Sequence, residues 1–515
     1  MKLSTLLKGV KTVSENNNPS FIDGNATAII SNSNELVDGC VFVCIKGMRF
    51  DGHTKAEEAL KKGALAVVVE RDLGLERQIV VENTREALSI LASNFYGNPG
   101  SKLKLIGVTG TNGKTTTTTI IKHILEHCGY KVGQVSTIEH DTGDEIIPAV
   151  NGTPEPLELQ MLLAKMVENG CEYVVMEPSS QALEQRRVHG EHFIASGFTN
   201  FTQDHLDYHG NMENYFLAKK MLCDISDFTI VNFDDEAGRR LLKDDGIKTF
   251  SFSTKEKYGI NQTATDETVT DETITDGTNP DEINFNETCF IADNIKISSG
   301  GGSYWLCYEE KSYPVRFSLL GEYNVANTLL AAAICYKIGM PIRKIIDAIS
   351  TCKGVKGRSE VIPTGRDFTV ICDYAHTADG LENILPSVRE YAHGRVICLF
   401  GCGGNRDRTK RPQMGRAAAH GADYLIITSD NPRDEDPQAI IDDILKGIED
   451  IDIPYDIVVD RKEAIYHALR IARTGDVIVL AGKGHEDYLI LEDDLHIHFD
   501  EREIVRDALL ELFPD

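Results

Sequence analysis

"LKLIGVTGTNGKTTTT", residues 103–118, joins an apolar run to a turn rich in glycine and threonine. The run predicts a buried strand, and the threonines predict the first turns of a helix. Glycines let backbone N–H groups approach phosphate oxygens, Lys114 adds a cation, and Thr115 offers a hydroxyl to Mg2+. Although Val108 stands where the common P-loop pattern has its first glycine, we expect a nucleoside triphosphate to bind here and not a simple glycine-rich turn. The predicted site comprises Gly110, Thr111, Asn112, Gly113, Lys114, Thr115 and Thr116.

Five other apolar runs also end in polar groups. "YVVM" is followed by "EPSSQ", "TVIC" by "DYAHT", "VICLF" by "GCGGNRDRTKR", "YLII" by "TSDNPRDE" and "VIVLA" by "GKGHED". Ligands of open α/β sheets bind beyond the carboxyl ends of the strands. One such cluster is usually a turn, but six of them predict a cleft where several polar ligands meet.

The length and the pattern of runs predict three α/β domains. A chain of 515 residues with 41% hydrophobic side chains holds more core than one domain normally buries. We expect boundaries near residues 99 and 349, giving domains 1–99, 100–349 and 350–515, with a parallel sheet and crossover helices in the middle domain. Residues 264–288 repeat a Thr-Asp-Glu-Thr phrase and hold eight acidic residues without one Lys or Arg. They predict a solvated insertion, within about 260–290, that carries no chemistry.

Charge and cysteine usage exclude several classes of protein. The formal net charge of -27 would repel nucleic acid and anionic membrane surfaces. The N-terminus has too short an apolar run for a secretory signal, and no stretch reaches the length of a transmembrane helix. Most of the twelve cysteines stand in apolar runs without CxxC spacing, which indicates reduced core thiols. We therefore expect a cytoplasmic protein.

Two further segments suggest a metal site. Glu177 ends an apolar run, where a carboxylate can either hold Mg2+ or cap a helix. The phrase "TNFTQDHLDYH" adds His205 and His209, whose spacing also occurs in zinc sites, but no third ligand follows at a suitable distance. In the next helical segment, "NMENYFLAKKML", Lys219 and Lys220 would by themselves be taken as solvated lysines.

Taken together, these phrases resemble one family, the Mur ligases of peptidoglycan synthesis, and within it the UDP-N-acetylmuramoyl-dipeptide amino-acid ligases (the MurE type). The matching phrases are "GTNGKTT", "TPEPLELQ", "DHLDYHG", "AKKML", "GEYNVANTLLAA", "DYAHTADGLEN", "FGCGGNRDRTKRPQMG", "SDNPR" and "AGKGHEDY", in the family's order. The resemblance implies a UDP-sugar domain, a central P-loop ATPase domain and a Rossmann-like amino-acid domain. We expect the protein to be a monomer. It also implies ADP-forming amide synthesis through an acyl phosphate.

The resemblance assigns roles to individual residues. Lys219 would be carbamylated by CO2 and would join Thr115, Glu177 and His205 around Mg2+, because a carbamate is an oxygen ligand where an ammonium would repel the cation. The implied catalytic residues are Lys114, Glu177, His205 and Lys219, and Asn327, Arg358 and Asp373 would contact ATP. The implied UDP-muramoyl-peptide residues are Ser31, Ser33, Met48, Arg49, Phe50, Asn151, Gly152, Thr153, Ser179, Gln185 and Arg187.

The phrase "DNPR" matches the family's signature for meso-diaminopimelate, whose distal end carries an ammonium and a carboxylate. Arg433 can pair with that carboxylate, and acidic groups can hold the ammonium. The implied residues are Arg406, Asp430, Asn431, Pro432, Arg433, Gly482 and Glu486. The chain departs from the family's pattern at "SNSN" (residues 31–34), Gly152, Pro178, Gln181, Ser359 and Ala378. Two alternatives therefore stay open: a paralogue that uses another amino acid, such as L-lysine, or a modified muramoyl-peptide, and a non-catalytic paralogue that binds precursors.

Overall fold

The computed structural model describes residues 1–13, 22–47, 50–255, 289–298 and 301–513. The predicted acidic insertion (264–288) and the predicted site residues Met48 and Arg49 lie outside these ranges. The chain divides into two compact units. Unit 1 holds residues 1–291, 307–312 and 327–348, and unit 2 holds 292–306, 313–326 and 349–515. The α/β class is confirmed, whereas the predicted boundaries near residues 99 and 349 stay a prediction.

Unit 1 begins with a small parallel sheet in the order β1-β2-β3-β4. Its strands are β1 (Ile29–Ile30), β2 (Val41–Val43), β3 (Ala66–Val69) and β4 (Gln78–Val80). The accompanying helices are α1 (Leu3–Leu6), α3 (Ala56–Lys61) and α4 (Thr84–Phe95), with short 3-10 turns η1 (Ser33–Glu35), η2 (Gly52–Lys55) and η3 (Pro99–Lys102). Alternate residues of β2 and β3 enter two separate cores, because successive side chains of a strand point to opposite faces.

Among the described residues, a second sheet has the strand order β15-β14-β13-β12-β11-β10-β5-β9-β6-β7-β8. Strands β5, β6 and β9 to β13 pair in parallel, and β7 and β8 form an antiparallel edge. The bounds are β5 (Lys104–Thr109), β6 (Val132–Val135), β7 (Glu139–Asp141), β8 (Ile146–Pro148), β9 (Tyr173–Met176), β10 (Phe193–Phe198), β11 (Thr229–Asn232), β12 (Thr249–Ser253), β13 (Cys289–Ser298), β14 (Gly301–Tyr308) and β15 (Lys311–Phe317). The predicted P-loop strand, β5, lies between β10 and β9, so the turn that follows it opens at the middle of the parallel strands.

Most helices of this region stand between strands of the sheet in chain order, as crossover units require, and the last two follow β15. They are α5 (Lys114–His127), α6 (Pro156–Glu168), α7 (Ser180–Glu184), α8 (Leu206–His209), α9 (Met212–Asp224) and α10 (Glu236–Leu242), followed by α12 (Tyr323–Lys337) and α13 (Ile342–Thr351). Helix α5 begins where Gly113 adopts a left-handed conformation, and it buries Ile120, Ile121, Ile124 and Leu125. The P-loop is thus anchored by a buried strand on one side and an amphipathic helix on the other.

Unit 2 contains a sheet in the order β16-β17-β21-β18-β19-β20, in which every neighbouring pair except β16 with β17 is parallel. Its strands are β16 (Glu360–Ile362), β17 (Thr369–Asp373), β18 (Val396–Phe400), β19 (Tyr424–Ile427), β20 (Tyr455–Ile457) and β21 (Val477–Ala481). Its helices are α14 (Ala378–Arg389), α15 (Lys410–Gly421), α16 (Pro437–Leu445), α17 (Arg461–Ile471) and α18 (Glu501–Leu512). A hairpin of β22 (Tyr488–Ile490) and β23 (His496–His498), which encloses η4 (Glu492–Asp494), follows β21.

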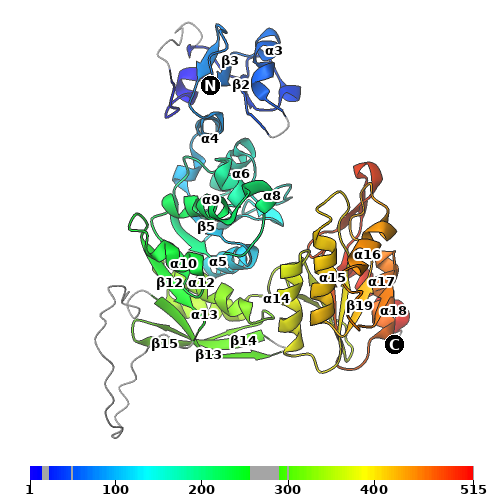
Figure 1. Ribbon diagram of the computed structural model, residues 1–515. Coiled ribbons are helices and arrows are strands. Elements are labelled where there is room, and N and C mark those ends of the chain that lie inside the picture. The colour runs from blue at the N-terminus through cyan, green and yellow to red at the C-terminus, as the bar shows by residue number, and fades with distance from the viewer. Residues whose placement is uncertain (14–21, 48–49, 256–288, 299–300, 514–515) are drawn as a thin grey trace, which may run out of the picture. The chain divides into compact units, whose positions relative to one another are not determined.

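Strands β18 and β21 are buried along their whole length, and helices cover both faces of this sheet (Figure 1). Cys398 and Phe400 of β18 pack into the core that contains α14, α15 and α16. The alternate residues Ile397 and Leu399 pack into the core that contains α17 and α18. This two-sided burial explains the continuous apolar runs in the sequence, and it is the arrangement expected of a Rossmann-like domain. Within the described ranges, no helix is both long and apolar enough to cross a bilayer.

Candidate functional site

The P-loop has two glycines that no other residue could replace without a shift. Gly110 (φ 140°) and Gly113 (φ 83°) have positive φ values. A Cβ on Gly110 would lie 1.9 Å from Oγ1 of Thr199, and a Cβ on Gly113 would lie 2.4 Å from Oδ1 of Asn327. The loop therefore needs glycine both for its backbone conformation and for its close contacts. Asn327, predicted to contact the nucleotide, lies beside the loop and also accepts a hydrogen bond from the Thr117 hydroxyl at 3.4 Å.

Asn200, which the sequence analysis did not select, supports the same loop. Its backbone carbonyl accepts from the Thr111 N–H at 2.9 Å, and its Oδ1 accepts from the Asn112 N–H at 2.8 Å. The Thr111 hydroxyl also donates to the carbonyl of Thr202 at 3.1 Å. Asn200 follows β10, so its place after an apolar run was the available signal.

Lys114 and Lys219 converge on one carbonyl. Both ammonium groups donate to the backbone oxygen of Gly110, at 3.0 Å from Lys114 and 2.7 Å from Lys219. Lys219 is 2% exposed, and its Nζ lies 4.6 Å from the centre of the Tyr215 ring. Burial, and then the nearby Lys114 ammonium, lower the pKa of Lys219 well below its ordinary value, against the opposing effect of Asp204.

The two adjacent lysines of α9 thus differ in burial and in their partners. Lys220 is at the surface, where it pairs with Asp224 at 2.5 Å and Asp244 at 3.3 Å. The interpretation of Lys219 as a solvated lysine, which its sequence alone would suggest, is wrong. The helical phase could have shown this, because Lys219 comes four residues after the buried Tyr215 and three before the buried Leu222.

Glu177 lies beside the first turn of α5. It is 1% exposed, its Oε2 accepts from the Thr115 hydroxyl at 2.8 Å, and its Oε1 accepts from the Thr137 N–H at 3.4 Å. The Thr115 and Thr137 hydroxyls are 3.1 Å apart. Thr116, the next residue of α5, is partly exposed. A buried carboxylate next to a hydroxyl at a P-loop is the donor chemistry that Mg2+ prefers, so these residues fit that ion.

His205 and His209 occupy different surroundings. His205 adopts a left-handed conformation (φ 51°), is about half exposed, and pairs with Asp204 at 3.3 Å. The buried His209 is instead 2.9 Å from the Ser180 hydroxyl and 3.0 Å from Glu184. Over the described ranges, no three His, Cys, Asp or Glu side chains are grouped so as to hold a metal. The ring centres of His205 and Tyr215 are 6.3 Å apart, which places His205 near the ring under Lys219.

Four of the predicted muramoyl-peptide residues form one hydrogen-bonded group: Thr153, Ser179, Gln185 and Arg187. Arg187 donates to the carbonyl of Thr153 at 2.7 Å and to Oε1 of Gln185 at 3.0 Å, and it pairs with Glu155 at 2.7 Å. The Thr153 hydroxyl donates to the Glu177 carbonyl at 2.8 Å, which connects this group to the metal-binding candidates. Ser179 contributes a backbone N–H that donates to the same threonine hydroxyl, at 3.0 Å.

A pocket of about 270 Å3 adjoins this group. It is lined by Ser31, Ile45, Arg85, Leu88, Glu155, Pro156 and Gln185. Of these, Ser31 and Gln185 were predicted from the sequence, whereas Arg85, at the start of α4, was missed because it reads as a solvated charge. Among the predicted residues that the structure describes, three others are absent from this lining: Ser33 begins η1, and Phe50 and Asn151 are exposed.

Gly152 packs against Thr137. A Cβ on Gly152 would lie 2.3 Å from Cγ2 of Thr137, while Oγ1 of Thr137 faces Thr115. A residue with a side chain at position 152 would therefore require Thr137 to move. The glycine at position 152, where the chain departs from the family's pattern, is thus consistent with the close packing of Thr137 at this position.

Unit 2 contains the two other residues predicted to contact ATP. Asp373, at the end of β17, accepts from the Ser359 N–H at 2.6 Å and from the Ala375 N–H at 2.8 Å. Burial raises the pKa of this carboxyl, against the opposing effect of Arg358. The Arg358 guanidinium lies 4.8 Å from the centre of the Tyr374 ring. Both residues thus border the "DYAHT" turn.

The "DNPR" turn brings arginines to a glycine loop. Arg433 has a left-handed backbone (φ 52°), and its Nη1 donates to the Gly404 carbonyl at 3.0 Å. The Gly404 N–H donates in turn to the carbonyl of Asn431 at 2.9 Å. A Cβ on Gly403 would lie 3.1 Å from Nη1 of Arg433 and 3.8 Å from Cγ of Arg406. The two predicted arginines therefore flank the same glycine, with Arg406 exposed.

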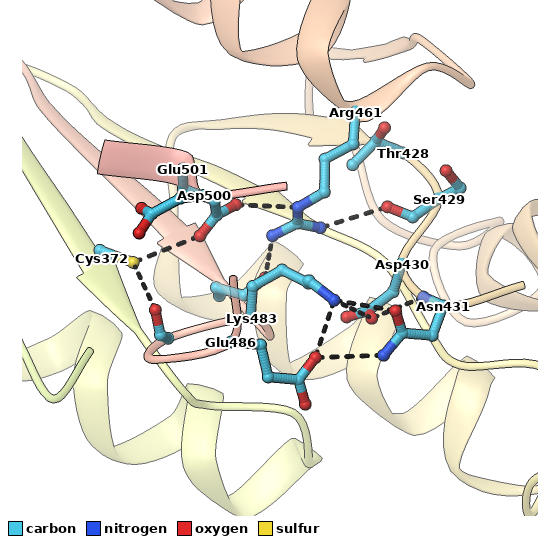
Figure 2. Close-up of polar contacts among 12 residues, drawn as sticks. Cys372, Thr428, Ser429, Asp430, Asn431, Arg461, Lys483, Glu486, Asp500 and Glu501 are labelled. Carbon is cyan, nitrogen blue, oxygen red and sulfur yellow. Dashed lines mark hydrogen bonds and ion pairs between the residues drawn. The ribbon is translucent and has the colours of Figure 1, made fainter. Parts of the chain in front are cut away.

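Behind these arginines lies a buried polar network, shown in Figure 2. Lys483 is fully buried and donates to Oδ1 of Asn431 at 2.8 Å and to Oε2 of Glu486 at 2.7 Å. Asn431 also donates from Nδ2 to Oε2 of Glu486 at 3.1 Å. Burial would raise the pKa of Asp430, but Lys483 and Arg461 outweigh it and lower that pKa. Gly482 (φ 114°) packs against Asp430, and Pro432 is buried in the same turn.

A second buried cation braces this network. Arg461, at the start of α17, and Glu501, at the start of α18, form an ion pair at 2.8 Å with both side chains fully buried. Arg461 also donates to the Ala481 carbonyl at 2.7 Å and to the Ser429 carbonyl at 3.3 Å (Figure 2). It therefore joins the ends of β19 and β21, which carry the "DNPR" and "GKGHE" turns. Arg461, Lys483 and Glu501 were not among the residues predicted from the sequence.

Comparison with known proteins gives matches along nearly the whole chain. Residues 26–96 match the description "Mur ligase family, catalytic domain", 108–335 the Mur ligase middle domain, and 357–484 the Mur ligase glutamate ligase domain. A UDP-N-acetylmuramoyl-L-alanyl-D-glutamate–2,6-diaminopimelate ligase of Clostridium tetani is 41% identical, with all of both chains covered. A ligase of the same name from Clostridium acetobutylicum, numbered 1, is 42% identical, again with all of both chains covered. A solved structure of a ligase of that name is similar with a TM-score of 0.64 and 28% identity, covering 95% of this chain and 96% of that one.

Proposed function

The chain belongs to the Mur ligase family, and from this premise we propose that it is an ATP-dependent, ADP-forming ligase. In this proposal it adds meso-diaminopimelate to UDP-N-acetylmuramoyl-L-alanyl-D-glutamate, in the synthesis of the peptidoglycan precursor. The observation that carries the amino-acid assignment is the "DNPR" turn, where Arg433 and Arg406 flank a glycine loop next to the buried network of Asp430 and Glu486. The relatives named for this reaction share about two fifths of their residues with the whole chain.

The P-loop supports the ATP half of the proposal. Its backbone N–H groups and Lys114 bind the phosphates, and Asn327 fixes the loop from the side. Arg358 and Asp373 belong to the same proposal as residues that would bind the nucleotide. Transfer of the γ-phosphoryl to the D-glutamate carboxylate turns a poor electrophile into an acyl phosphate, and ADP leaves. The amino group of the incoming amino acid then attacks the acyl carbon, releasing phosphate and forming the amide.

Thr115, Glu177, His205 and Lys219 would hold Mg2+. When bound, the ion neutralises the negative charge that develops on the phosphoryl oxygens. Lys219 suits carbamylation because its lowered pKa increases the fraction of the side chain that is present as the neutral, nucleophilic amine. Its nitrogen bonds to the carbon of CO2 and loses one proton, giving an anionic carbamate whose oxygens can bind a cation. The same modification would remove a positive charge from beside Lys114, with which Lys219 shares the Gly110 carbonyl.

The residues around Thr153, Gln185 and Arg187, with the pocket at Ser31, would bind the UDP-muramoyl-peptide. Met48 and Arg49 belong to the same proposal. We also propose that the enzyme works in the cytoplasm, because all twelve cysteines are free, as is usual in a reducing compartment. The monomeric state stays a prediction.

The deciding experiment measures phosphate release from ATP by the purified protein with Mg2+ and UDP-N-acetylmuramoyl-L-alanyl-D-glutamate. Meso-diaminopimelate and L-lysine are compared as the amino acid. We expect release with meso-diaminopimelate and a product whose mass is that of the tripeptide. Turnover with L-lysine in its place would refute the amino-acid assignment, and silence with both would refute the ligase.

A Lys219→Ala variant tests whether the chain is instead a non-catalytic protein that binds precursors. A ligase loses turnover in this variant, because a ligand of the cation is missing. Lys220→Ala is the matched control, since Lys220 is the next residue of the same helix and pairs with two partly exposed carboxylates, Asp224 and Asp244. If both variants bind UDP-muramoyl-dipeptide like the unmodified protein and none of the three turns over ATP, the non-catalytic interpretation holds.

A further inference from the structure

The amino-acid region consists of the "DNPR" turn and the polar network behind it. Lys483 belongs to this network, and the proposed function gives it no role. It follows β21 directly, in the turn "GKGHE", and its side chain is fully buried. Burying an ammonium is costly unless it is paired and hydrogen-bonded, and Lys483 has acceptors from Asn431 and Glu486. Because Asn431 and Glu486 are assigned to substrate binding in the proposed function, Lys483 can determine how their side chains are oriented toward the substrate.

The charges of this cluster leave one unit of negative charge for a ligand. Asp430 and Glu486 each contribute one negative charge, and Lys483 contributes one positive charge at 3.9 Å from Asp430 and 2.7 Å from Glu486. Arg461 is matched by Glu501. Without the Lys483 ammonium, Asp430 and the partly buried Glu486 would lose the cation that pairs with both of them.

The hydrogen bonds also select one oxygen of Glu486. Its Oε2 is occupied by Lys483 at 2.7 Å and by Nδ2 of Asn431 at 3.1 Å. Figure 2 shows the other carboxylate oxygen pointing away from both donors. Within the part of the chain that the structure describes, that Oε1 has no hydrogen-bond partner. Lys483 also holds Asn431 through Oδ1, so the amide can present Nδ2 only toward Glu486.

We propose that Lys483 is a positioning residue that sets the specificity of this site for a diamino acid: it fixes Glu486 so that Oε1 accepts the distal ammonium of the substrate. The proposal rests on the proposed function, because it concerns the meso-diaminopimelate that Arg433 and Arg406 would hold by its distal carboxylate. In this arrangement the arginines recognise the carboxylate, and the cluster around Lys483 recognises the ammonium. A substrate without that ammonium would leave Oε1 of Glu486 unpaired.

The test compares meso-diaminopimelate with 2-aminopimelate, which keeps the reacting amine and the distal carboxylate but lacks the distal ammonium. We expect the unmodified protein to prefer meso-diaminopimelate in kcat/KM by on the order of 100-fold or more. In Lys483→Met that preference should fall by about tenfold or more, mainly through a higher KM for meso-diaminopimelate, with the KM for ATP unchanged. Lys483→Gln, which keeps an N–H donor without the charge, should lower the preference in the same direction and serves if Lys483→Met does not fold.

Arg395→Met is the matched control. Arg395 is a second cation of unit 2, pairs at 2.7 Å with the buried Asp476 and lies outside the network of Figure 2. Its loss should lower the thermal unfolding midpoint without changing the ratio of the two substrates. The proposal is overturned if Lys483→Met and Lys483→Gln keep that ratio within about twofold of the unmodified protein, or if Arg395→Met lowers it equally. Failure of the proposed function looks different, because the unmodified protein itself would then release no phosphate with meso-diaminopimelate.

Discussion

The P-loop of unit 1 and the amino-acid region of unit 2 are built on opposite principles. The P-loop lies within seven consecutive residues, and much of its polar surface is backbone, fixed by two glycines and by Asn200. The amino-acid region depends on charged side chains from distant parts of the chain, among them Arg461, Lys483 and Glu501. A site made of backbone dipoles costs little to bury, whereas buried charges must be paired. We therefore expect substitutions in the first region to affect activity before stability, and substitutions in the second to affect both.

The largest effect is expected from Arg461→Met. It leaves the fully buried Glu501 carboxylate without its cation, which should lower the free energy of unfolding by about 3–5 kcal/mol. Chemical denaturation measures this change. A double variant, Arg461→Met with Glu501→Gln, should recover part of the loss because no buried charge then remains unpaired.

The control for this prediction is Arg416→Met. Arg416 pairs with Asp450 at 2.6 Å, but both side chains are exposed, so its loss should cost less than about 1 kcal/mol. Equal destabilisation by Arg461→Met and Arg416→Met would remove the proposed contrast between the two regions.

Lys114→Met tests the other side of the comparison. The ammonium of Lys114 lies at the P-loop carbonyls, 3.0 Å from Gly110 O and 2.7 Å from Thr111 O, and would stabilise the transferring phosphoryl group. We expect kcat to fall by on the order of 100- to 1000-fold, which corresponds to about 2.7–4 kcal/mol. The unfolding midpoint should hardly change. Lys122→Met would be a poor control, because Lys122 is largely covered and pairs with Asp141. Lys220→Met is the better one, and a loss of stability in Lys114→Met comparable to that of Arg461→Met would contradict the comparison.

Arg433→Lys should have an intermediate effect. Lysine keeps the charge but cannot form two parallel hydrogen bonds to the distal carboxylate, so we expect kcat/KM for meso-diaminopimelate to fall by about 10- to 100-fold. Arg408→Lys is the control, since Arg408 lies on the loop beyond Arg406, is largely exposed and pairs with Glu435. Steady-state kinetics with varied amino acid distinguish the two variants. An unchanged KM for meso-diaminopimelate in Arg433→Lys would show that another residue binds the carboxylate.

The same contrast explains what the sequence could predict. Local patterns predict the P-loop, the polar ends of the strands and the α/β class. A glycine turn or an apolar run favours the same local structure whatever the distant residues are. The buried ion pair does not, since Arg461 stands beside Lys462 at the start of a helix and both have the pattern of solvated charges. Lys219 and Lys220 pose the same problem, which the phase of the helix resolves. Asn200 and Lys483 were missed because the contacts that reveal them join distant residues. Asn200 bonds to Asn112, 88 residues away, and Lys483 bonds to Asn431, 52 residues away.

The smallest effect sharpens the comparison within unit 1. Gly152→Ala would place a Cβ 2.3 Å from Cγ2 of Thr137, and Thr137 can relieve this contact only by moving away from Thr115. The backbone of Gly152 is outside the left-handed region, so the cost should come from this contact and amount to about 1 kcal/mol, seen as a several-fold higher KM for ATP. Thr137→Ser removes Cγ2 but keeps the hydroxyl that faces Thr115. If the contact is the cause, Gly152→Ala combined with Thr137→Ser should have a KM for ATP close to that of Thr137→Ser alone, whereas additive effects of the two substitutions would show that Gly152 acts through something other than Thr137.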